Sequence, residues 1–234
     1  MTISSRVKLL FYNILEGNTV AVTAEDAGFP KERMYDRSLG FYCKYSSASA
    51  FVVAVTQATA LPVDTLVIEG HALDNVLIDW QYSDNGSAWT TVQSWTQSGN
   101  TQILKQLTAP LTHIYWRVSM GSHLFQATEL FMGRALSIPV VWENSPDLHD
   151  VDDVDWIRTY GGIDHSVKTG PKRRYRAYTA FMDRINYPLV TFRSEIEYLD
   201  DYSKPFYLLD HEGACFLAKF DGGLPRESHM NQGL

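Results

Sequence analysis

Cysteine is scarce in this 234-residue chain, which holds only Cys43 and Cys215, far apart along the sequence. Two cysteines so placed do not indicate the disulfide framework of a small secreted domain. The seven histidines form no His-x-x-x-His pair and no Cys-x-x-Cys occurs, so the zinc-site templates fail. We therefore expect no zinc centre, no other metal ligands that the sequence can name, and no disulfide scaffold.

The chain also lacks the sequence signatures of catalysis. It contains no Gly-x-Ser-x-Gly motif, and neither cysteine lies in an activating context. Its 27 acidic residues single out no pair of carboxylates for glycoside cleavage. Gly161-Gly162 and Gly222-Gly223 are typical of turns and not of a phosphate-binding loop. We expect no catalytic residues, no bound cofactor and no enzyme activity.

Positive charge is in the minority, because 20 Lys and Arg residues face 27 Asp and Glu residues and the net charge is −7. No overall basic field is present to hold nucleic acid, and we expect no nucleic-acid partner. The basic run at residues 172–176 could bind phosphate, but a solvated strand edge or a contact to an acidic neighbour is favoured. An acidic block at residues 147–155 precedes it. Two blocks of opposite sign would suit head-to-tail contact between copies in an oligomer.

Long hydrophobic runs are missing as well. No apolar stretch reaches the length needed to span a bilayer, so we expect no membrane insertion. Residues 7–15 are interrupted by Lys8 and Asn13 and do not form the apolar core of a signal peptide. The expectation is a protein made in a cytoplasm and not exported by the usual signal.

Aromatic and β-forming residues are what the chain has in abundance. Aromatics make up 13% of it, with six Trp and thirteen Tyr, in a composition that is 45% apolar and 20% charged. Such a chain can bury a real core, and its large amphipathic rings favour sheet surfaces and interfaces alike. We expect Trp80, Trp89, Trp95 and Trp116 to lie in the core or on a sheet face.

Apolar residues recur with the period of two that is typical of strands. Asp84-Asn85-Gly86 predicts a hairpin, because Asn-Gly tolerates the positive φ angles of tight turns. Helical signals are limited to a single turn at residues 31–36 after Pro30 and to the spacing of residues 194–202. The predicted strands are 20–23, 50–55, 65–69, 76–82, 90–95, 102–107, 113–120, 127–132, 175–183, 189–192, 206–209 and 215–220.

A domain boundary is predicted near residues 136–146, where Pro139 and Pro146 flank a short apolar strand. The predicted fold class is all-β, with a sandwich over residues 1–138 and a small β domain for assembly over residues 139–234. Residues 224–234 read as an extended terminal arm, of the kind that reaches onto a neighbouring subunit.

Five spaced motifs between residues 13 and 133 carry a family resemblance. They are Gly28-Phe29-Pro30 with Asp36, the apolar pair around Gly70-His71, the hairpin from Tyr82 to Trp89, Trp116-Arg117-Val118, and Glu129-Leu130-Phe131-Met132-Gly133. In order and spacing this segment, about half of the chain, resembles the galactose-binding-like (discoidin, or F5/8 type C) jelly-roll sandwich. The resemblance implies that fold, and such sandwiches often hold a structural calcium near residues 26–36, largely through backbone carbonyls.

Followed by a second β domain, the sandwich resembles tail-tip or baseplate proteins of long-tailed bacteriophages. Residues 205–213, 216–220 and Arg226-Glu227 are similar to strand pairs in phage tail proteins. The resemblance implies a structural virion protein that forms, or attaches to, a ring of three or six copies joining the tail tube to the hub or receptor-binding proteins. Its location would be the virion tail, after synthesis in the host cytoplasm. In distal tail proteins the ring-forming domain usually comes first, so which tail-tip protein this is stays open.

The alternative function is a carbohydrate-binding module that recognises cell-surface glycans. Sugar sites need a flat aromatic face and a few polar groups. Phe41 and Tyr42, with Tyr45, share an expected loop or strand end, and His123 and Phe125 lie in the loop before the last strand of the sandwich. In related sandwiches that end holds ligands, so Phe41, Tyr42, His123 and Phe125 are the candidate carbohydrate-binding residues.

Two other interpretations of these rings remain. They could pack a neighbouring subunit or cap the core, which the pattern favours over sugar binding. A third function, as the accessory domain of an enzyme, would require a catalytic partner encoded elsewhere.

Overall fold

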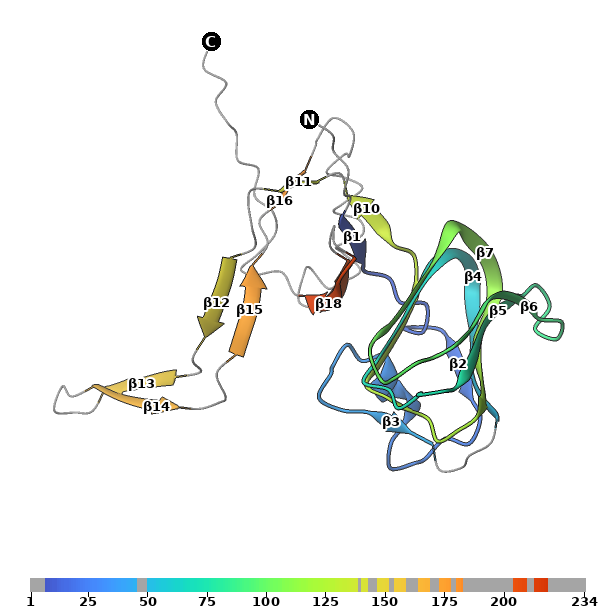
Figure 1. Ribbon diagram of the computed structural model, residues 1–234, viewed down its shortest axis with the longest axis horizontal. Coiled ribbons are helices and arrows are strands. Elements are labelled where there is room, and N and C mark those ends of the chain that lie inside the picture. Colours follow the sequence, from blue (N-terminus) through green and yellow to red (C-terminus); the bar gives the residue numbers. More distant parts are fainter. Residues whose placement is uncertain are drawn as a thin grey trace, which may run out of the picture. The chain divides into compact units, whose positions relative to one another are not determined.

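The computed structural model describes residues 7–45, 50–138, 140–142, 147–151, 154–158, 164–168, 173–177, 180–182, 204–209 and 213–218 (Figure 1). These residues form strands and a single 3-10 turn, which confirms the predicted all-β fold class. The chain divides into two compact units, one of residues 5–138 with 189–234 and the other of residues 1–4 with 139–188. The predicted boundary near residue 138 placed residues 189–234 in the second domain, whereas this division groups them with residues 5–138.

The larger unit contains thirteen of the labelled elements. They are β1 (Val7–Leu10), β2 (Thr19–Val22), η1 (Lys31–Met34), β3 (Cys43–Lys44), β4 (Ala50–Glu69), β5 (Leu77–Ser83), β6 (Thr90–Thr96), β7 (Ile103–Ser122), β8 (Gln126–Ala127), β9 (Glu129–Gly133), β10 (Leu136–Ile138), β17 (Phe206–Leu209) and β18 (Cys215–Ala218).

Two long strands, β4 and β7, build both layers of the sandwich. Residues 50–56 of β4 pair with residues 115–122 of β7, whereas residues 65–68 pair with residues 103–106. Between these two ladders the register shifts, near Pro62. A proline has no N–H to donate and is tolerated at such irregularities, and a strand that bends there can pass from one sheet to the other. The four separate strands predicted over these segments are therefore two continuous ones.

One layer holds β2, β5 and β6 with residues 50–56 of β4 and 115–122 of β7, and the other holds β9 with residues 65–69 of β4 and 103–106 of β7. The core lies between these two layers. Trp80 and Trp116 are fully buried in it, with ring centroids 5.8 Å apart. Trp89 and Trp95 are half-buried instead, each beneath a cation: Arg117 lies 4.1 Å from the Trp89 ring centroid and Lys105 lies 4.8 Å from that of Trp95. Trp80 and Trp116 thus lie in the core and Trp95 on a strand at the sheet surface, as predicted, whereas Trp89 lies in the loop just before β6.

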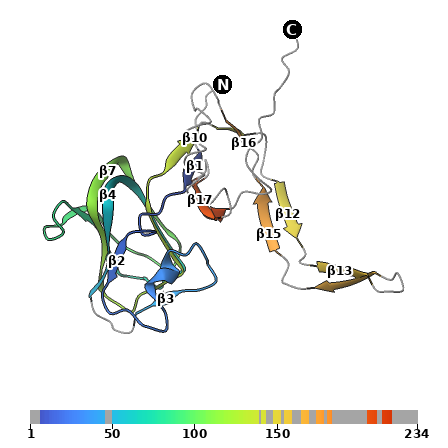
Figure 2. The same ribbon diagram turned by 180° about the vertical axis from the view of Figure 1, so that it is seen from behind.

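A third layer covers the outer side of the sandwich. Strands β10, β1, β17 and β18 form a four-stranded antiparallel sheet, visible in both views (Figures 1 and 2). Leu10 and Tyr207 of this sheet pack with Val67 of β4 and Phe131 of β9 in a second buried cluster. Because β9 is covered on both sides, all five of its residues are buried, which matches its uninterrupted Leu-Phe-Met run.

The predicted hairpin is present, but its loop is longer than the Asn-Gly signal indicates. Strand β5 ends at Ser83 and β6 begins at Thr90. Gly86 has a φ of +74°, whereas Asn85 is not among the residues with positive φ. The Asn85 side chain accepts the backbone N–H groups of Ser87 and Ala88, both at 2.9 Å. Asn85 therefore closes the loop through its side chain and not through its backbone angle.

The described residues of the smaller unit form antiparallel strand pairs. They are β11 (Val140–Trp142) with β16 (Ala180–Met182), β12 (Asp147–Val151) with β15 (Arg173–Ala177), and β13 (Val154–Arg158) with β14 (Asp164–Lys168).

The register of β12 and β15 bears on the two charged blocks. Asp150 is the register partner of Arg174, so part of the acidic block lies opposite the basic run within one chain. Charge complementarity between these blocks therefore does not by itself require a second copy. The predicted strand at 189–192, the helical spacing at 194–202 and the arm at 224–234 lie outside the described residues.

No helix among the residues that the structure describes has the length and apolar composition to cross a membrane.

Candidate functional site

The loop between β2 and β4 carries the exposed aromatic residues of the sandwich. It contains η1, which follows Pro30 as the single predicted turn, and β3. Strand β3 pairs with β8, and the Tyr45 N–H donates to the Phe125 carbonyl at 3.1 Å. This pairing brings the segments at 41–45 and 123–127, which are far apart in sequence, together at one end of the sandwich (Figure 1).

Two of the four candidate residues present their rings to solvent. Phe41 is 60% exposed and Tyr42 is 40% exposed. Phe29 stacks on Tyr42, with ring centroids 5.0 Å apart and an interplanar angle of 16°. We call Phe29, Phe41 and Tyr42 the aromatic patch. Large apolar side chains at such exposure do not serve the core, so the patch is a candidate contact surface.

Two cations lie over the aromatic patch. The Arg33 guanidinium carbon is 5.8 Å from the Phe29 ring centroid and 5.6 Å from that of Phe41. The Lys44 ammonium is 5.9 Å from the Phe29 centroid. Cations at these distances are attracted by the negative faces of the rings. The end of the sandwich therefore combines flat apolar faces with hydrogen-bond donors.

The other two candidate residues do not offer free surfaces. Phe125 is 1% exposed and packs against Tyr45, with centroids 5.5 Å apart, so its ring is part of the core. Its backbone pairs with Tyr45, which turns the side chain inward. His123 is half-buried, and its Nε2 lies 2.6 Å from the Ala72 carbonyl, which holds the imidazole in place.

A single buried arginine anchors the loop that carries the patch. Arg37 has a φ of +60°. Its guanidinium donates to the Pro205 carbonyl at 2.7 Å, to the Phe11 carbonyl at 2.6 Å and to the Glu16 carboxylate. Its backbone N–H donates to Glu129 Oε2 at 3.0 Å. Arg37 thus ties the loop to β9, to the segment after β1 and to the residue before β17.

Glu129 is a buried carboxyl next to this anchor. Burial raises its pKa to about 9, and the nearby carboxylates of Asp36 and Glu16 act in the same direction. The hydrogen bond from the Arg37 N–H lowers the pKa but does not offset burial. The group is therefore protonated and neutral near pH 7.

The carboxylates of Asp26 and Asp36 serve the backbone of the loop. Asp26 accepts the Gly28 N–H and Asp36 accepts the Ser38 N–H, both at 2.9 Å. Within the described part of the chain, no group of three or more His, Cys, Asp or Glu side chains could hold a metal ion. These side chains close turns, and no calcium ligand set can be named from them.

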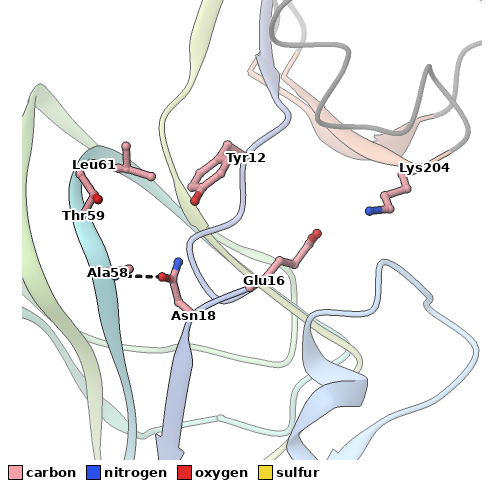
Figure 3. A pocket seen from close by; sticks show the side chains of 8 residues that line it. Tyr12, Glu16, Asn18, Ala58, Thr59, Leu61 and Lys204 are labelled. Carbon is pink, nitrogen blue, oxygen red and sulfur yellow. Dashed lines mark hydrogen bonds between the residues drawn. The ribbon is translucent and has the colours of Figure 1, made fainter.

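A second candidate is the hollow beside β1 and β4, with a volume of about 590 Å³. Figure 3 shows Tyr12, Glu16 and Lys204 around it, together with Asn18. The polar groups are already used by the fold, because Asn18 accepts the Ala58 N–H at 3.2 Å and Glu16 binds Arg37. Its lining residues are Tyr12, Glu16, Gly17, Asn18, Ala58, Thr59, Leu61 and Lys204. We consider this hollow a weaker candidate for a binding site than the aromatic patch.

The groups that could suggest catalysis occur in structural settings. His113 Nδ1 lies 2.6 Å from Asp84, and the imidazole stacks on Tyr82 with centroids 3.6 Å apart. Cys43 is fully buried, and burial raises the pKa of its thiol to about 12. A thiol so placed stays protonated and is a poor nucleophile.

No protein-family profile matches this chain, and no curated protein matches it. Among solved structures, 106 chains match this chain. One is the chitosan-binding module 1 of a chitosanase/glucanase from Paenibacillus sp. IK-5, with 19% identity, TM-score 0.45, and coverage of 53% of this chain and 99% of that one.

Two further structural neighbours come from Clostridium perfringens. The family 32 carbohydrate-binding module of NanJ, in complex with galactose, has 17% identity and TM-score 0.44, covering 54% of this chain and 98% of that one. The module CpGH89CBM32-6 has 12% identity and TM-score 0.46, covering 53% and 99%. At these scores and identities the neighbours do not assign a function to this chain. None of the three is a tail-tip or baseplate protein, and all are carbohydrate-binding modules.

Three residues of the site were not among the candidates, namely Phe29, Arg33 and Lys44. A signal for Lys44 exists in the alternation of residues 42–45, where exposed and buried positions alternate. If Cys43 and Tyr45 face the core, Tyr42 and Lys44 must face away from it. Arg33 has no comparable signal, because its position over Phe41 depends on how the loop folds.

Proposed function

We propose that this protein is a non-catalytic binding protein whose aromatic patch recognises a saccharide. The observation that carries the proposal is the exposure of Phe41 and Tyr42 on a loop that is anchored from below by Arg37. Pyranose rings present apolar C–H faces that pack on flat aromatic rings, while donors beside the rings bind the hydroxyl oxygens. Arg33 and Lys44 supply such donors.

The anchoring of the loop supports saccharide recognition because it reduces the conformational entropy that the loop loses when a ligand binds. A loop held by several buried hydrogen bonds loses little conformational entropy when a ligand binds. The stack of Phe29 on Tyr42 adds a further restraint to the rings. The patch is thus ordered before any ligand arrives.

The test is direct binding to a panel of soluble polysaccharides by affinity electrophoresis, followed by calorimetry. The panel includes chitosan and galactan, since two structural neighbours are named for chitosan binding and a galactose complex. We expect Phe41→Ala and Tyr42→Ala each to weaken binding about five- to tenfold, or about 1–1.5 kcal/mol. The matched control is Leu77→Ala, which removes another exposed apolar side chain, 52% exposed on β5. Equal losses for all three variants, or no binding to any polysaccharide, would contradict the proposal.

A second candidate function is assembly into a larger structure, as expected for a tail-tip subunit in the virion tail. The observation that favours it is the smaller unit, where β13 and β14 pair only with each other among the described residues. Two-stranded ribbons are marginally stable in water unless they pack against something else. Docking of this unit on another chain, such as tail tube or hub, would provide that packing.

Light scattering of the full-length protein across a concentration series tests the assembly function. A closed ring of three or six copies is the expected result if the protein builds a ring by itself. A monomer at every concentration would count against self-assembly and leave saccharide binding as the function to pursue.

A further inference from the structure

The two cations over the aromatic patch form no ion pair among the described residues. The pKa of the Asp36 carboxyl is raised by burial, and the Arg33 charge partly offsets that rise. Within the part of the chain that the structure describes, neither Arg33 nor Lys44 forms a salt bridge or a side-chain hydrogen bond. Their contacts are with the rings of Phe29 and Phe41. Lys44 is exposed and Arg33 is partly so. Both charges are thus available to a ligand that packs on the patch.

Other charged side chains of the same loop are already engaged. Lys31 lies 3.3 Å from Glu25 and 3.6 Å from Glu32. Asp26 and Asp36 accept backbone N–H groups within their own turns. Arg33 and Lys44 are therefore the charged groups beside the rings that the described residues do not engage in an ion pair or a side-chain hydrogen bond, in a chain whose net charge is −7.

The kind of polar group at the patch decides the kind of saccharide that fits. Guanidinium and ammonium groups are donors only and cannot accept from a sugar hydroxyl. A neutral sugar, whose hydroxyls both donate and accept, would leave these charges only partly satisfied. A carboxylate has only acceptors, and the guanidinium fork matches its two oxygens.

We propose that the ligand of the aromatic patch is an acidic saccharide that carries a carboxylate, such as a uronic acid residue. This inference rests on the proposed function. The pyranose ring packs on Phe41 or Tyr42, Arg33 binds the carboxylate, and Lys44 contributes a second positive charge. Because the whole chain is acidic, such binding comes from the patch and not from general attraction of polyanions.

The experiment uses the full-length protein and ligands that differ only in charge. Polygalacturonate and alginate are compared with the same polymers after their carboxylates have been reduced to primary alcohols. Affinity electrophoresis and calorimetry are run at about 50, 150 and 500 mM NaCl. Across this range salt screens the attraction between exposed charges more and more strongly. We expect at least one acidic polymer to bind about tenfold more tightly than its reduced form. That preference should shrink as salt rises.

Substitutions identify the residues that cause the preference for the acidic polymer. Arg33→Gln is expected to remove most of the discrimination between acidic and reduced polymer, and Lys44→Gln part of it. The matched control for Arg33→Gln is Arg117→Gln, which removes an arginine from above another ring, that of Trp89 in the loop before β6. The control for Lys44→Gln is Lys105→Gln, beside Trp95. Both controls should bind like the unaltered protein, and thermal melts establish that all four variants are folded.

The outcomes separate this inference from the proposed function. If a reduced polymer binds as tightly as its acidic parent, and Phe41→Ala weakens both, saccharide binding stands and the acidic preference is overturned. If the control variants lose as much of the discrimination between acidic and reduced polymer as Arg33→Gln does, the attraction is nonspecific and the inference is also overturned. If no polymer binds and Phe41→Ala changes nothing, the proposed function and the inference fail together.

Discussion

At the scale of single residues, Arg37 is the side chain on which the loop of the aromatic patch depends. Arg37 is 8% exposed, and its guanidinium donates to two backbone carbonyls and a carboxylate that lie far apart in sequence. Arg37→Gln cannot span these acceptors, and buried oxygens would lose their partners. We expect the variant to lose about 2–4 kcal/mol of unfolding free energy in urea denaturation.

The control for Arg37→Gln is Arg33→Gln, which lies in the same loop but has its guanidinium over the rings of Phe29 and Phe41 and in no ion pair among the described residues. That change should alter stability by less than about 0.5 kcal/mol. Comparable losses for the two variants would show that Arg37 is not the anchor of the loop.

Glu129 predicts an unusual dependence of stability on pH. Its pKa is raised by burial to about 9 from 4.5, so between these values the folded state holds a proton that the unfolded state has released. The contribution of this bound proton to the free energy of unfolding is therefore complete below pH 4.5 and is lost as the pH rises towards 9. Glu129→Gln mimics the neutral form and should be more stable than the unaltered protein at pH 8, by more than about 1 kcal/mol, but not at pH 5.

The comparison for this effect is Glu25→Gln. The pKa of Glu25 is lowered, chiefly by the hydrogen bond from the Lys31 N–H, so removal of its charge should bring no gain of stability at pH 8. Urea denaturation at the two pH values measures both variants. A Glu129→Gln variant with no gain at pH 8 would show that the carboxyl is ionised in the folded protein.

At the scale of elements, the approach of β9 to the segment after β1 depends on a glycine. A Cβ on Gly133 would lie 2.0 Å from the Tyr12 carbonyl oxygen, at the bridge between Asn13 and Gly133. Asn13 reinforces this closure, because its side chain donates to the Leu130 carbonyl at 2.8 Å and accepts the Met132 N–H at 3.1 Å. The backbones must separate to admit even a methyl group.

Gly133→Ala is therefore expected to lower the melting temperature strongly, at a cost of more than about 2 kcal/mol. Gly121→Ala is the matched control, since Gly121 also lies in a strand and a Cβ there meets nothing within 4 Å. The control should cost less than about 0.5 kcal/mol or stabilise the protein slightly. Similar melting temperatures for the two variants would contradict the close approach at Gly133.

At the scale of the whole molecule, β17 and β18 complete the sandwich unit from the far end of the chain. Tyr207 covers Phe131, with ring centroids 6.1 Å apart, and its hydroxyl donates to Glu69 at 3.0 Å. A chain ending at Ile138 lacks this cover and exposes apolar side chains of β4 and β9. We expect it to be less stable than the full chain by more than about 2 kcal/mol and to bind more of a hydrophobic dye.

Urea denaturation and dye fluorescence of the two chains measure this difference. Equal stability would mean that residues 1–138 form a self-sufficient domain, as the sequence division at that point implies. A clear loss would mean that residues 206–218 are part of the same folding unit.

What the sequence by itself determined is local: the alternation that predicts strands, the turn after Pro30, and the placing of Trp80, Trp95 and Trp116 in the core or on a sheet face. These follow from short-range periodicity, which a single chain carries in its own residues. The tertiary structure alone decided that β4 and β7 run through both layers and that β17 pairs with β1. It also buried Phe125 and placed Arg33 over Phe41. Such placements depend on pairing between distant segments, as in β3 with β8, and no local pattern of residues encodes the partner of a strand.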